Sequence, residues 1–394
     1  MAQSIRIIIL FQVIWILSFF QTVGQTRIPE KAGKGVSFVA ADSSFSLKLN
    51  GRIQNLYVGE KDLDNNRYTD GISVRRARLK FEGFALNPNW EYKIELALSN
   101  QDIAGGTDAH SNTANIVLDA MAKWNFAPGY ALIFGQSKLP GNRERVISSQ
   151  KMQFADRSLL NARYNLDRDA GIQLHHQSEL GKAVFRQIAS ISMGEGRNIT
   201  AGNHKGYDYT GRLEILPFGE FESEGDYVGG DISRETSPKF SLGITYDYND
   251  NATRERGQLG DFFDQSRDLT TIFADAMFKY NGFSVMAEYA DRNTEGSPVV
   301  KTTNNGTVEE SFFTGTGFNI QAGYLFKNNF EFAGRYTAIN PETVTQRENN
   351  KQYTIGLSKY IVGHTVKVQS DISLLQENKN LSELMYRFQI EIGF

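Results

Sequence analysis

The sequence predicts an all-β protein, a 16-stranded antiparallel transmembrane β-barrel with an inward-folded third extracellular loop. Three observations predict this fold. Apolar residues recur at every second position and not with the period of a helix. The connections between the predicted strands are alternately short and long, as they are in outer-membrane barrels. Aromatic residues gather at strand ends beside the short connections, where amphipathic rings meet both hydrocarbon and water.

Composition excludes several other classes of protein. The chain has 394 residues, no cysteine, and 42 Lys and Arg against 45 Asp and Glu. Without cysteine it has no disulfide, thiolate zinc site, iron–sulfur cluster or cysteine nucleophile. The slightly acidic balance argues against nucleic acid as a partner, because proteins that bind it are usually basic. After residue 23 no stretch is apolar enough for a membrane helix.

The N-terminal segment 1–24 is typical of a secretory signal peptide. A short, weakly cationic start precedes an almost wholly apolar run from Ile7 to Phe20. Thr22 and Gly24 supply the small residues that precede a cleavage site. A membrane anchor helix is the alternative, but the apolar run is short and polar residues follow it at once.

Export also sets the predicted domain organisation. We expect the mature chain to begin at Gln25, with residues 25–44 as a periplasmic N-terminal extension and residues 45–394 as the transmembrane barrel. Within the barrel, residues 139–167 form the predicted constriction loop. An exported chain without cysteine that folds as a barrel points to the outer membrane of a Gram-negative bacterium.

Sixteen segments of the mature chain show the alternation. In the last of them, Phe388 and Ile392 lie on one face, and Arg387 and Glu391 lie on the other. The approximate ranges are 45–58, 74–86, 90–100, 114–126, 130–138, 168–177, 182–193, 206–217, 238–249, 268–280, 283–293, 316–326, 330–340, 351–360, 364–376 and 384–394.

A soluble β-sandwich is the alternative for such a pattern, but its strands average about 5–6 residues and these are longer. In hydrocarbon every backbone N–H and C=O must be paired, so a sheet that spans a membrane must close on itself. Sixteen strands enclose more space than side chains fill, which leaves an aqueous channel. Polar residues on the inner face then cost little.

The connections and the aromatic residues define two different rims. Short turns such as Asn87–Asn89 and Asn281–Gly282 alternate with long connections, and short turns are periplasmic in such barrels. Residues 218–237 break this rule, because they belong to the short-turn rim yet are long and acidic, and the pattern does not explain them. The aromatic residues at the short-turn rim are Trp90, Trp124, Phe126, Tyr130, Phe218, Tyr280, Phe283, Phe326, Phe330, Tyr360 and Phe394.

A row of cations in the second predicted strand is the first candidate for a functional site. If Leu79 and Phe81 face lipid, then Arg76, Arg78 and Lys80 face the channel as a ladder with steps of about 7 Å. Such a row attracts and passes on an anion. The alternative is a solvated wall without strong preference.

The third long loop is the second candidate. It runs over 29 residues from Leu139 to Asp167 and mixes basic with apolar side chains that need burial. We expect it to fold into the channel and narrow it; a surface flap is the alternative. With the ladder, the predicted pore-lining set is Arg76, Arg78, Lys80, Lys123, Arg143, Arg145, Lys151, Arg157, Arg163 and Arg168. The inward wall as a whole, with the ladder included, has nearly balanced charges, so strong selectivity must come from the loop and the ladder.

Three stretches carry a resemblance to a known family. These are the sequences Arg75–Gly83, Gly135–Arg145 with its continuation through Phe154–Ser158 and Asn165–Gly171, and Leu216–Phe221. With them the chain resembles the phosphate-selective porin O and P family over essentially all of residues 45–394. The resemblance implies a 16-stranded trimeric channel with an inward third loop and a basic anion path, which here carries over to the Arg76, Arg78 and Lys80 row and the Arg and Lys residues of 143–168.

We therefore expect an outer-membrane porin for passive diffusion of small anions such as phosphate, assembled as a homotrimer in outer-membrane lipid. We expect no catalytic residue, no cofactor and no metal site, since the five histidines are scattered and no hydrolase motif occurs. One alternative is a general or oligosaccharide-permeable porin without anion selectivity. Another is an envelope protein that is not a channel, such as an adhesin or a barrel enzyme.

Overall fold

The computed structural model describes residues 25–27, 33–99, 101–103, 115–199 and 206–394. The predicted signal peptide 1–24 lies outside the described residues. Among the described residues no helix is long and apolar enough to cross a bilayer.

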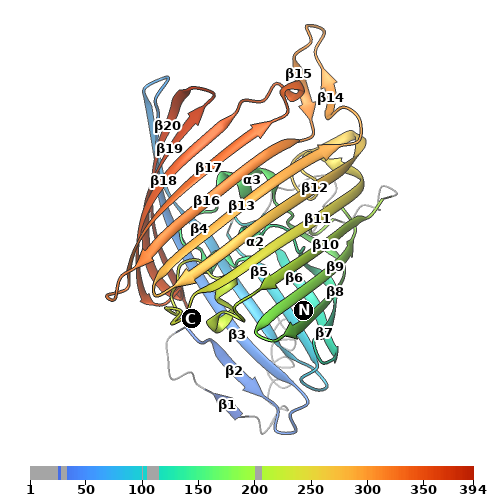
Figure 1. The fold of residues 1–394 in the computed structure, drawn as a ribbon, viewed down its shortest axis with the longest axis vertical. Coiled ribbons are helices and arrows are strands. Elements are labelled where there is room, and N and C mark those ends of the chain that lie inside the picture. The colour runs from blue at the N-terminus through green and yellow to red at the C-terminus, as the bar shows by residue number, and fades with distance from the viewer. Residues whose placement is uncertain (1–24, 28–32, 100, 104–114, 200–205) are drawn as a thin grey trace, which may run out of the picture.

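Within the described residues, sixteen antiparallel strands form a closed barrel (Figure 1). Each strand pairs with the next in the chain, and the last closes the ring against the first through pairs from Gly393↔Arg52 to Glu383↔Asp62. The strands are β3 (Ser46–Asp62), β4 (Arg67–Phe84), β5 (Trp90–Ala97), β6 (Val117–Ala127), β7 (Tyr130–Lys138), β8 (Arg168–Leu180), β9 (Ala183–Ser192), β10 (Asp208–Leu216), β11 (Lys239–Arg254), β12 (Phe262–Tyr280), β13 (Phe283–Thr294), β16 (Gly315–Leu325), β17 (Phe330–Pro341), β18 (Asn350–Val362), β19 (Val366–Glu377) and β20 (Asn380–Gly393).

The predicted 16-stranded antiparallel barrel is confirmed, and every predicted strand has a counterpart in it. The main differences are at the long-loop rim, where β11 continues to Arg254 and β12 already begins at Phe262. These two strands remain hydrogen-bonded as a ladder beyond the alternating region that identified them, with register shifts near Ala252.

The smaller elements lie at the rims and between the strands. A hairpin of β14 (Val299–Thr302) and β15 (Val308–Ser311) projects from the long-loop rim (Figure 1). The short strand β2 (Val36–Val39) pairs with the start of β3 and with β1 (Gln25–Arg27). The helical turns are α2 (Arg143–Val146), η2 (Ser149–Lys151), α3 (Leu159–Tyr164), η3 (Glu222–Tyr227) and η4 (Thr343–Thr345).

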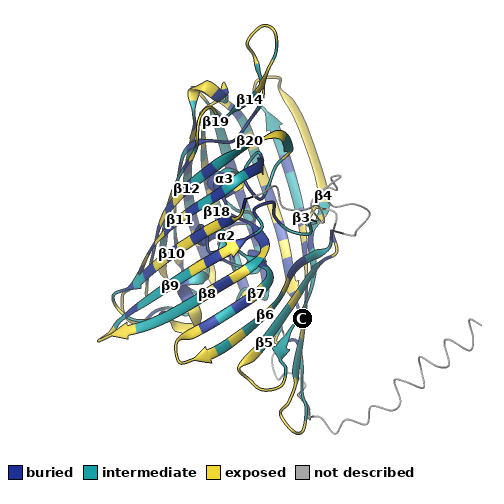
Figure 2. Ribbon diagram, turned by 90° about the vertical axis from the view of Figure 1, so that its right-hand side faces the viewer, coloured by how far each residue is buried: buried dark blue, intermediate teal, exposed yellow. Residues whose placement is uncertain are grey.

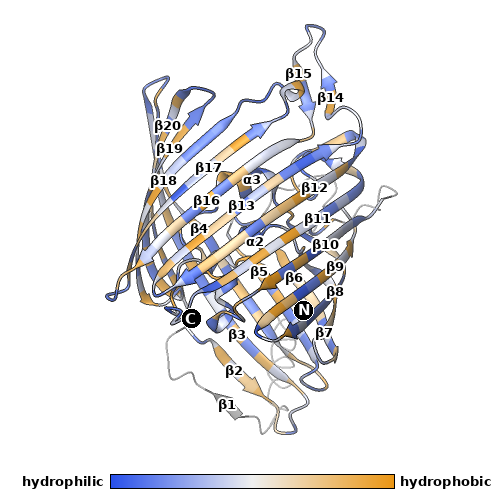
Figure 3. Ribbon diagram, in the orientation of Figure 1, coloured by the Kyte–Doolittle hydropathy of each residue, from blue (hydrophilic) through white to orange (hydrophobic). Residues whose placement is uncertain are grey.

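Burial follows the two-residue period along the strands (Figure 2). In β20, the side chains of Gln389 and Glu391 are fully buried, whereas Ile390 is 42% exposed and Ile392 is 50% exposed. Apolar and polar residues alternate in the same way over the barrel surface (Figure 3). The apolar face is therefore the outer, lipid-facing one, and the polar face is the inner one.

The aromatic band at the short-turn rim has one exception. Trp90 and Trp124 stack on the outer face with ring centroids 5.0 Å apart, and both are partly exposed. Tyr360 does not belong to this band: it is only 2% exposed, and its hydroxyl donates to Glu331 at 2.5 Å. The reason is the alternation of faces along β18. Tyr353 faces outward, so Lys359, which follows it by three two-residue steps, is also on the outer side, and position 360 faces inward.

Candidate functional site

The basic site begins at an irregularity in β4. Gln54 of β3 pairs with Arg76, and Asn55 pairs with Val74, so Arg75 has no partner of its own in the ladder. Such a β-bulge places two consecutive residues of one strand opposite one residue of its neighbour. Here it lets the side chains of both Arg75 and Arg76 reach the same acceptor.

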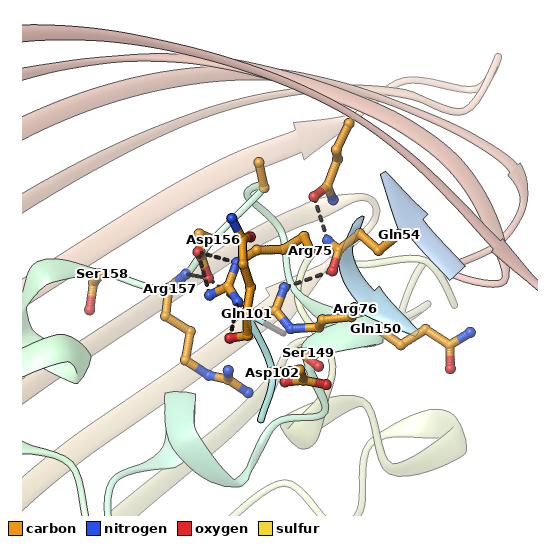
Figure 4. Close-up of polar contacts among 12 residues, drawn as sticks. Gln54, Arg75, Arg76, Gln101, Asp102, Ser149, Gln150, Asp156, Arg157 and Ser158 are labelled. Carbon is orange, nitrogen blue, oxygen red and sulfur yellow. Dashed lines mark hydrogen bonds and ion pairs between the residues drawn. The ribbon is translucent and has the colours of Figure 1, made fainter. Parts of the chain in front are cut away.

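That acceptor is Asp156 of the segment 139–167 (Figure 4). Arg75 Nη2 lies 2.9 Å from Asp156 Oδ2, and Arg76 Nη2 lies 3.1 Å from Asp156 Oδ1. Arg76 also donates from Nη1 to Gln54 Oε1 at 2.7 Å. Burial by itself raises the pKa of Asp156, but the charges of Arg76 and Arg75 outweigh it and hold that pKa below its usual value.

The segment 139–167 contacts strands on opposite sides of the barrel. Besides the Asp156 pair with β4, Arg143 Nε donates to Asp275 of β12 at 2.7 Å. The strands β4 and β12 are eight strands apart in the ring. From β17, Arg335 donates to the Asp156 carbonyl at 3.0 Å, and from β19, Lys367 donates to the Met152 carbonyl at 3.1 Å. Apolar burial contributes as well, because Leu160 and Tyr164 are fully buried in a cluster with Phe273 and Ile339.

A cavity of about 390 Å³ lies between β4, the segment 139–167 and the long connections. Its cations are Arg75, Arg76, Arg78, Lys138, Arg145, Arg157, Arg168, Arg197, Arg256 and Arg387. Its carboxylates are Asp102, Asp156 and Asp167. Ten cations against three carboxylates make this cavity strongly electropositive, and that is a suitable environment for an anion.

Several of these cations already have carboxylate partners. Arg78 donates from Nη1 to Glu95 at 2.8 Å and pairs through its other nitrogens with Asp102. Arg168 Nε lies 2.6 Å from Asp119, and Arg145 pairs with Asp167. Charge-assisted pairs of this kind fix the guanidinium planes at the cavity wall.

Arg157 differs from them. Within the described residues it makes no ion pair, and its guanidinium donates only to the carbonyls of Glu144 at 3.1 Å and Ile147 at 2.9 Å. Burial, followed by the positive charges of Arg145 and Arg76, lowers the pKa of Arg157 well below its usual value. A small anion in the cavity would relieve this repulsion.

A second basic cavity, of about 240 Å³, lies toward the short-turn rim. Its charged side chains are Arg52, Arg78, Lys80, Lys93, Glu95 and Lys151, and the C-terminal residue Phe394 also lines it. Arg78 lines both cavities, and its partners Asp102 and Glu95 belong to the first and the second cavity respectively. The two cavities are therefore neighbours along the barrel, separated at Arg78.

The structure divides the ten sequence-predicted site residues into three groups. The first cavity is lined by Arg76, Arg78, Arg145, Arg157 and Arg168. The second is lined by Lys80 and Lys151, and again by Arg78. Neither of these two cavities includes Lys123, Arg143 or Arg163. Lys123 lies 3.4 Å from Glu91, and the Arg163 guanidinium lies 5.7 Å from the Phe313 ring centroid.

Arg143 lines neither cavity and has a network of partners of its own. Its side chain is fully buried. It lies 2.7 Å from Asp275 and 3.3 Å from Glu214, and its guanidinium packs over the Tyr227 ring. A buried guanidinium needs such carboxylate partners, so Arg143 anchors the segment 139–167 to the wall.

Sequence reasoning missed five cations that line the first cavity: Arg75, Lys138, Arg197, Arg256 and Arg387. Arg75 has the wrong parity for an inward residue, and only the bulge brings it in. Arg197 and Arg256 come from other long connections, whose folding no periodic pattern predicts. Arg387 does have inward parity, and its sequence signal was present, but many wall cations share that signal.

With the geometry described, comparison with known proteins is informative. A model of the family "Phosphate-selective porin O and P" matches residues 47–384. The chain belongs to this family. It is also 24% identical over 389 residues to an uncharacterized protein of Aquifex aeolicus (strain VF5), with 88% of this chain and 87% of that protein covered.

Solved porins share the fold of this family member. The anion-selective porin from Comamonas acidovorans superimposes with a TM-score of 0.56 at 11% identity, covering 89% of this chain and all (100%) of that one. The outer-membrane channel DcaP of Acinetobacter baumannii gives 0.55 at 13% identity, covering 92% and 100%. The trimer form of OmpT from Vibrio cholerae gives 0.52 at 12% identity, covering 89% and 100%. At such low identity, these similarities show the fold alone.

Membership of the porin family makes the chain a channel protein of the Gram-negative outer membrane. Proteins of this family are channels and not enzymes. Among the described residues, no group of three or more His, Cys, Asp or Glu side chains is placed to hold a metal ion.

Proposed function

We propose that this porin conducts small anions, phosphate among them, by passive diffusion through the two basic cavities. The observation that carries the proposal is that ten cations but only three carboxylates line the first cavity. Counted over all inward-facing strand positions of the sequence, cations and carboxylates are similar in number, so this cavity is where an anion gains most electrostatic free energy. The name of the family and that of the Comamonas porin agree with this preference.

In this proposal the segment 139–167 is the constriction. It carries Arg145 and Arg157 into the first cavity and Lys151 into the second, so a solute that passes it meets cations on both sides. The strands facing the segment 139–167 supply further cations, namely Arg76, Arg78, Lys80 and Arg168. An anion would move between these groups, which bind it strongly enough to admit it and weakly enough to release it.

The remaining parts of the proposal concern export and assembly. Residues 1–24 are removed as a signal peptide, and residues 25–44, whose β2 pairs with the short-turn end of β3, lie in the periplasm. The barrel assembles as a homotrimer in outer-membrane lipid, as the trimer form of the similar OmpT suggests.

Reversal potentials across planar bilayers under a salt gradient test the ion preference. We expect anions to permeate better than cations, and phosphate to saturate the current because it binds in the cavities. Cation preference would reject the anion proposal. Block by oligosaccharides together with no saturation by phosphate would favour a general or oligosaccharide-permeable porin instead.

A further inference from the structure

The long acidic connection between β10 and β11, residues 217–238, has a role that the channel function alone does not explain. We call it the floor segment. It belongs to the short-turn rim, yet it contains η3 and several fully buried residues, among them Asp226 and Asp231. In Figure 1 it lies, in yellow-green, near the end of the barrel that carries the C-terminus. A free turn at this rim would need only a few residues.

The floor segment runs beneath a large part of the barrel. Gly282 N, in the β12–β13 turn, donates to Asp231 at 2.7 Å. Arg234 donates to the Leu325 carbonyl at 2.8 Å, next to the β16–β17 turn. His364, in the β18–β19 turn, lies 2.9 Å from the Gly229 carbonyl. A chain that leaves β10 and contacts these three turns crosses under the strands from β10 to β19.

The floor segment is also fastened to the constriction above it. Gly229 N donates to the Lys151 carbonyl at 2.6 Å, and Arg143 donates to the Asp226 carbonyl at 3.1 Å. Phe221 is buried in one apolar cluster with Ile147 of the segment 139–167. Apolar burial combined with satisfied backbone groups makes this an ordered part of the fold and not a loose loop.

The space left open lies beside the floor segment, toward β3–β5 and β20. The second basic cavity is lined by residues of β3, β4, β5 and β20, by Ser148, Gln150 and Lys151, by Gly33 and Phe394, and by Thr365 of the β18–β19 turn, and no residue of the floor segment lines it. The floor segment and the second cavity also differ in the sign of their charge. Glu220, Glu222 and Glu224 of the floor segment are exposed, whereas the second cavity has five cations and one acidic side chain.

We propose that the floor segment closes the periplasmic mouth beneath β10–β19 and confines the exit of permeating anions to the second basic cavity, beside β3–β5 and β20. The inference rests on the proposed anion channel for the identity of the solute. The route itself depends only on where the floor segment lies. Its exposed carboxylates add to the steric block, because they repel an anion that approaches the closed half.

The absence of cysteine in the chain permits a direct test of the route. Single variants Gln150→Cys, in the second cavity, and Ser223→Cys and Ser233→Cys, on the floor segment, are reconstituted and treated from the periplasmic side with a bulky thiol-specific reagent. We expect the reagent to reduce the conductance of Gln150→Cys by more than half and to leave both floor variants unchanged. Mass spectrometry confirms that each thiol is labelled.

Two outcomes would overturn the proposal. One is an equal loss of conductance in a labelled floor variant, and the other is full conductance in fully labelled Gln150→Cys. Ion preference is read separately from the reversal potential. If the channel prefers cations, the anion function fails, while the pattern of block still decides the route.

Loosening the floor segment provides an independent measurement. Arg234→Ala removes the hydrogen bonds to the Leu325 and Phe326 carbonyls that hold its far end. We expect higher conductance, and a labelled Ser233→Cys should now reduce the current in this background. Lys239→Ala is the control, because Lys239 contacts the floor segment only at its start beside β10, through the Phe218 carbonyl. Equal conductance of Arg234→Ala and the parent would argue against a closing role.

Discussion

Arg76 and Asp156 form an ion pair of 3.1 Å that joins the barrel wall to the segment 139–167. Asp156 accepts from Arg75 as well, so one carboxylate serves two neighbouring guanidinium groups. The pair therefore has two consequences. It fixes the position of the segment, and it holds both arginines at the cavity wall with part of their charge uncompensated.

The pH dependence of this contact follows from the lowered pKa of Asp156. A carboxyl whose folded-state pKa lies below its unfolded value, about 3.9, stabilises the fold at all higher pH. That contribution is lost only as the pH falls through the folded-state pKa. We expect the difference in unfolding temperature between the parent and Asp156→Asn to stay constant from about pH 7 to about pH 5 and to shrink at lower pH. A difference that already disappears near pH 6 would show that the pKa is raised instead.

The cations of β4 should govern ion preference. Arg76→Ala combined with Arg78→Ala removes two of the ten cations of the first cavity, and Arg78 is also shared with the second. We expect the anion-to-cation permeability ratio to fall several-fold, because the local potential weakens. Reversal potentials measure this ratio.

Lys123→Ala is the matched control for the β4 cations. It removes a wall cation that lies beside Glu91 and lines neither cavity. The ratio should change little. If Lys123→Ala and the double variant of β4 had equal effects, selectivity would depend on total wall charge and not on the cavities.

The comparison of Arg75 with Arg76 shows how far the sequence could predict this site. Strand parity identified Arg76 as inward, since each residue of a regular strand alternates between the two faces. The same rule placed Arg75 in the outer face, and it failed there because a bulge shifts the register after Gln54. Nothing in the local sequence marks that bulge.

The barrel itself was predictable because a membrane imposes a strict two-residue period on every strand. The bounds of the segment 139–167 were predictable for the same reason, since β7 ends at Lys138 and β8 begins at Arg168. The contacts of loop residues were not, because they depend on packing between distant parts of the chain. Arg143 illustrates this, as its partner Asp275 is 132 residues away. The constriction role of the segment stays a prediction.

Arg143 should matter for stability more than for ion preference. Arg143→Met leaves Asp275 and Asp226 without one of their buried partners. Removing one member of a buried ion network costs about 3–5 kcal/mol. We expect a lower unfolding temperature and a larger, noisier conductance, because the segment 139–167 loses its anchor on β12.

Arg163→Met is the control for the anchor. Arg163 is partly exposed, and its guanidinium makes a cation–π approach to Phe313, which is worth about 0.5–1 kcal/mol at such sites. Its unfolding temperature should stay close to that of the parent. An unchanged unfolding temperature in Arg143→Met would mean that the buried network does not hold the segment.

Arg157 should contribute strongly to anion binding, because its guanidinium makes no ion pair among the described residues. Its neighbour Arg145 already pairs with Asp167. A charge-assisted hydrogen bond to an anion is worth about 1.5–3 kcal/mol, so its loss weakens binding about tenfold or more. We expect the phosphate concentration that half-saturates the current to rise by that factor in Arg157→Gln.

Arg145→Gln provides the matched comparison for Arg157, because it removes the same formal charge from the same cavity. Asp167 then remains without its Arg145 partner, and this carboxylate can turn to Arg168, which lies 3.8 Å away. Loss of Arg145 therefore removes less unpaired positive charge from the cavity than loss of Arg157 does. A half-saturating concentration that rises more in Arg145→Gln than in Arg157→Gln would contradict the assignment of Arg157 as an unpaired anion contact.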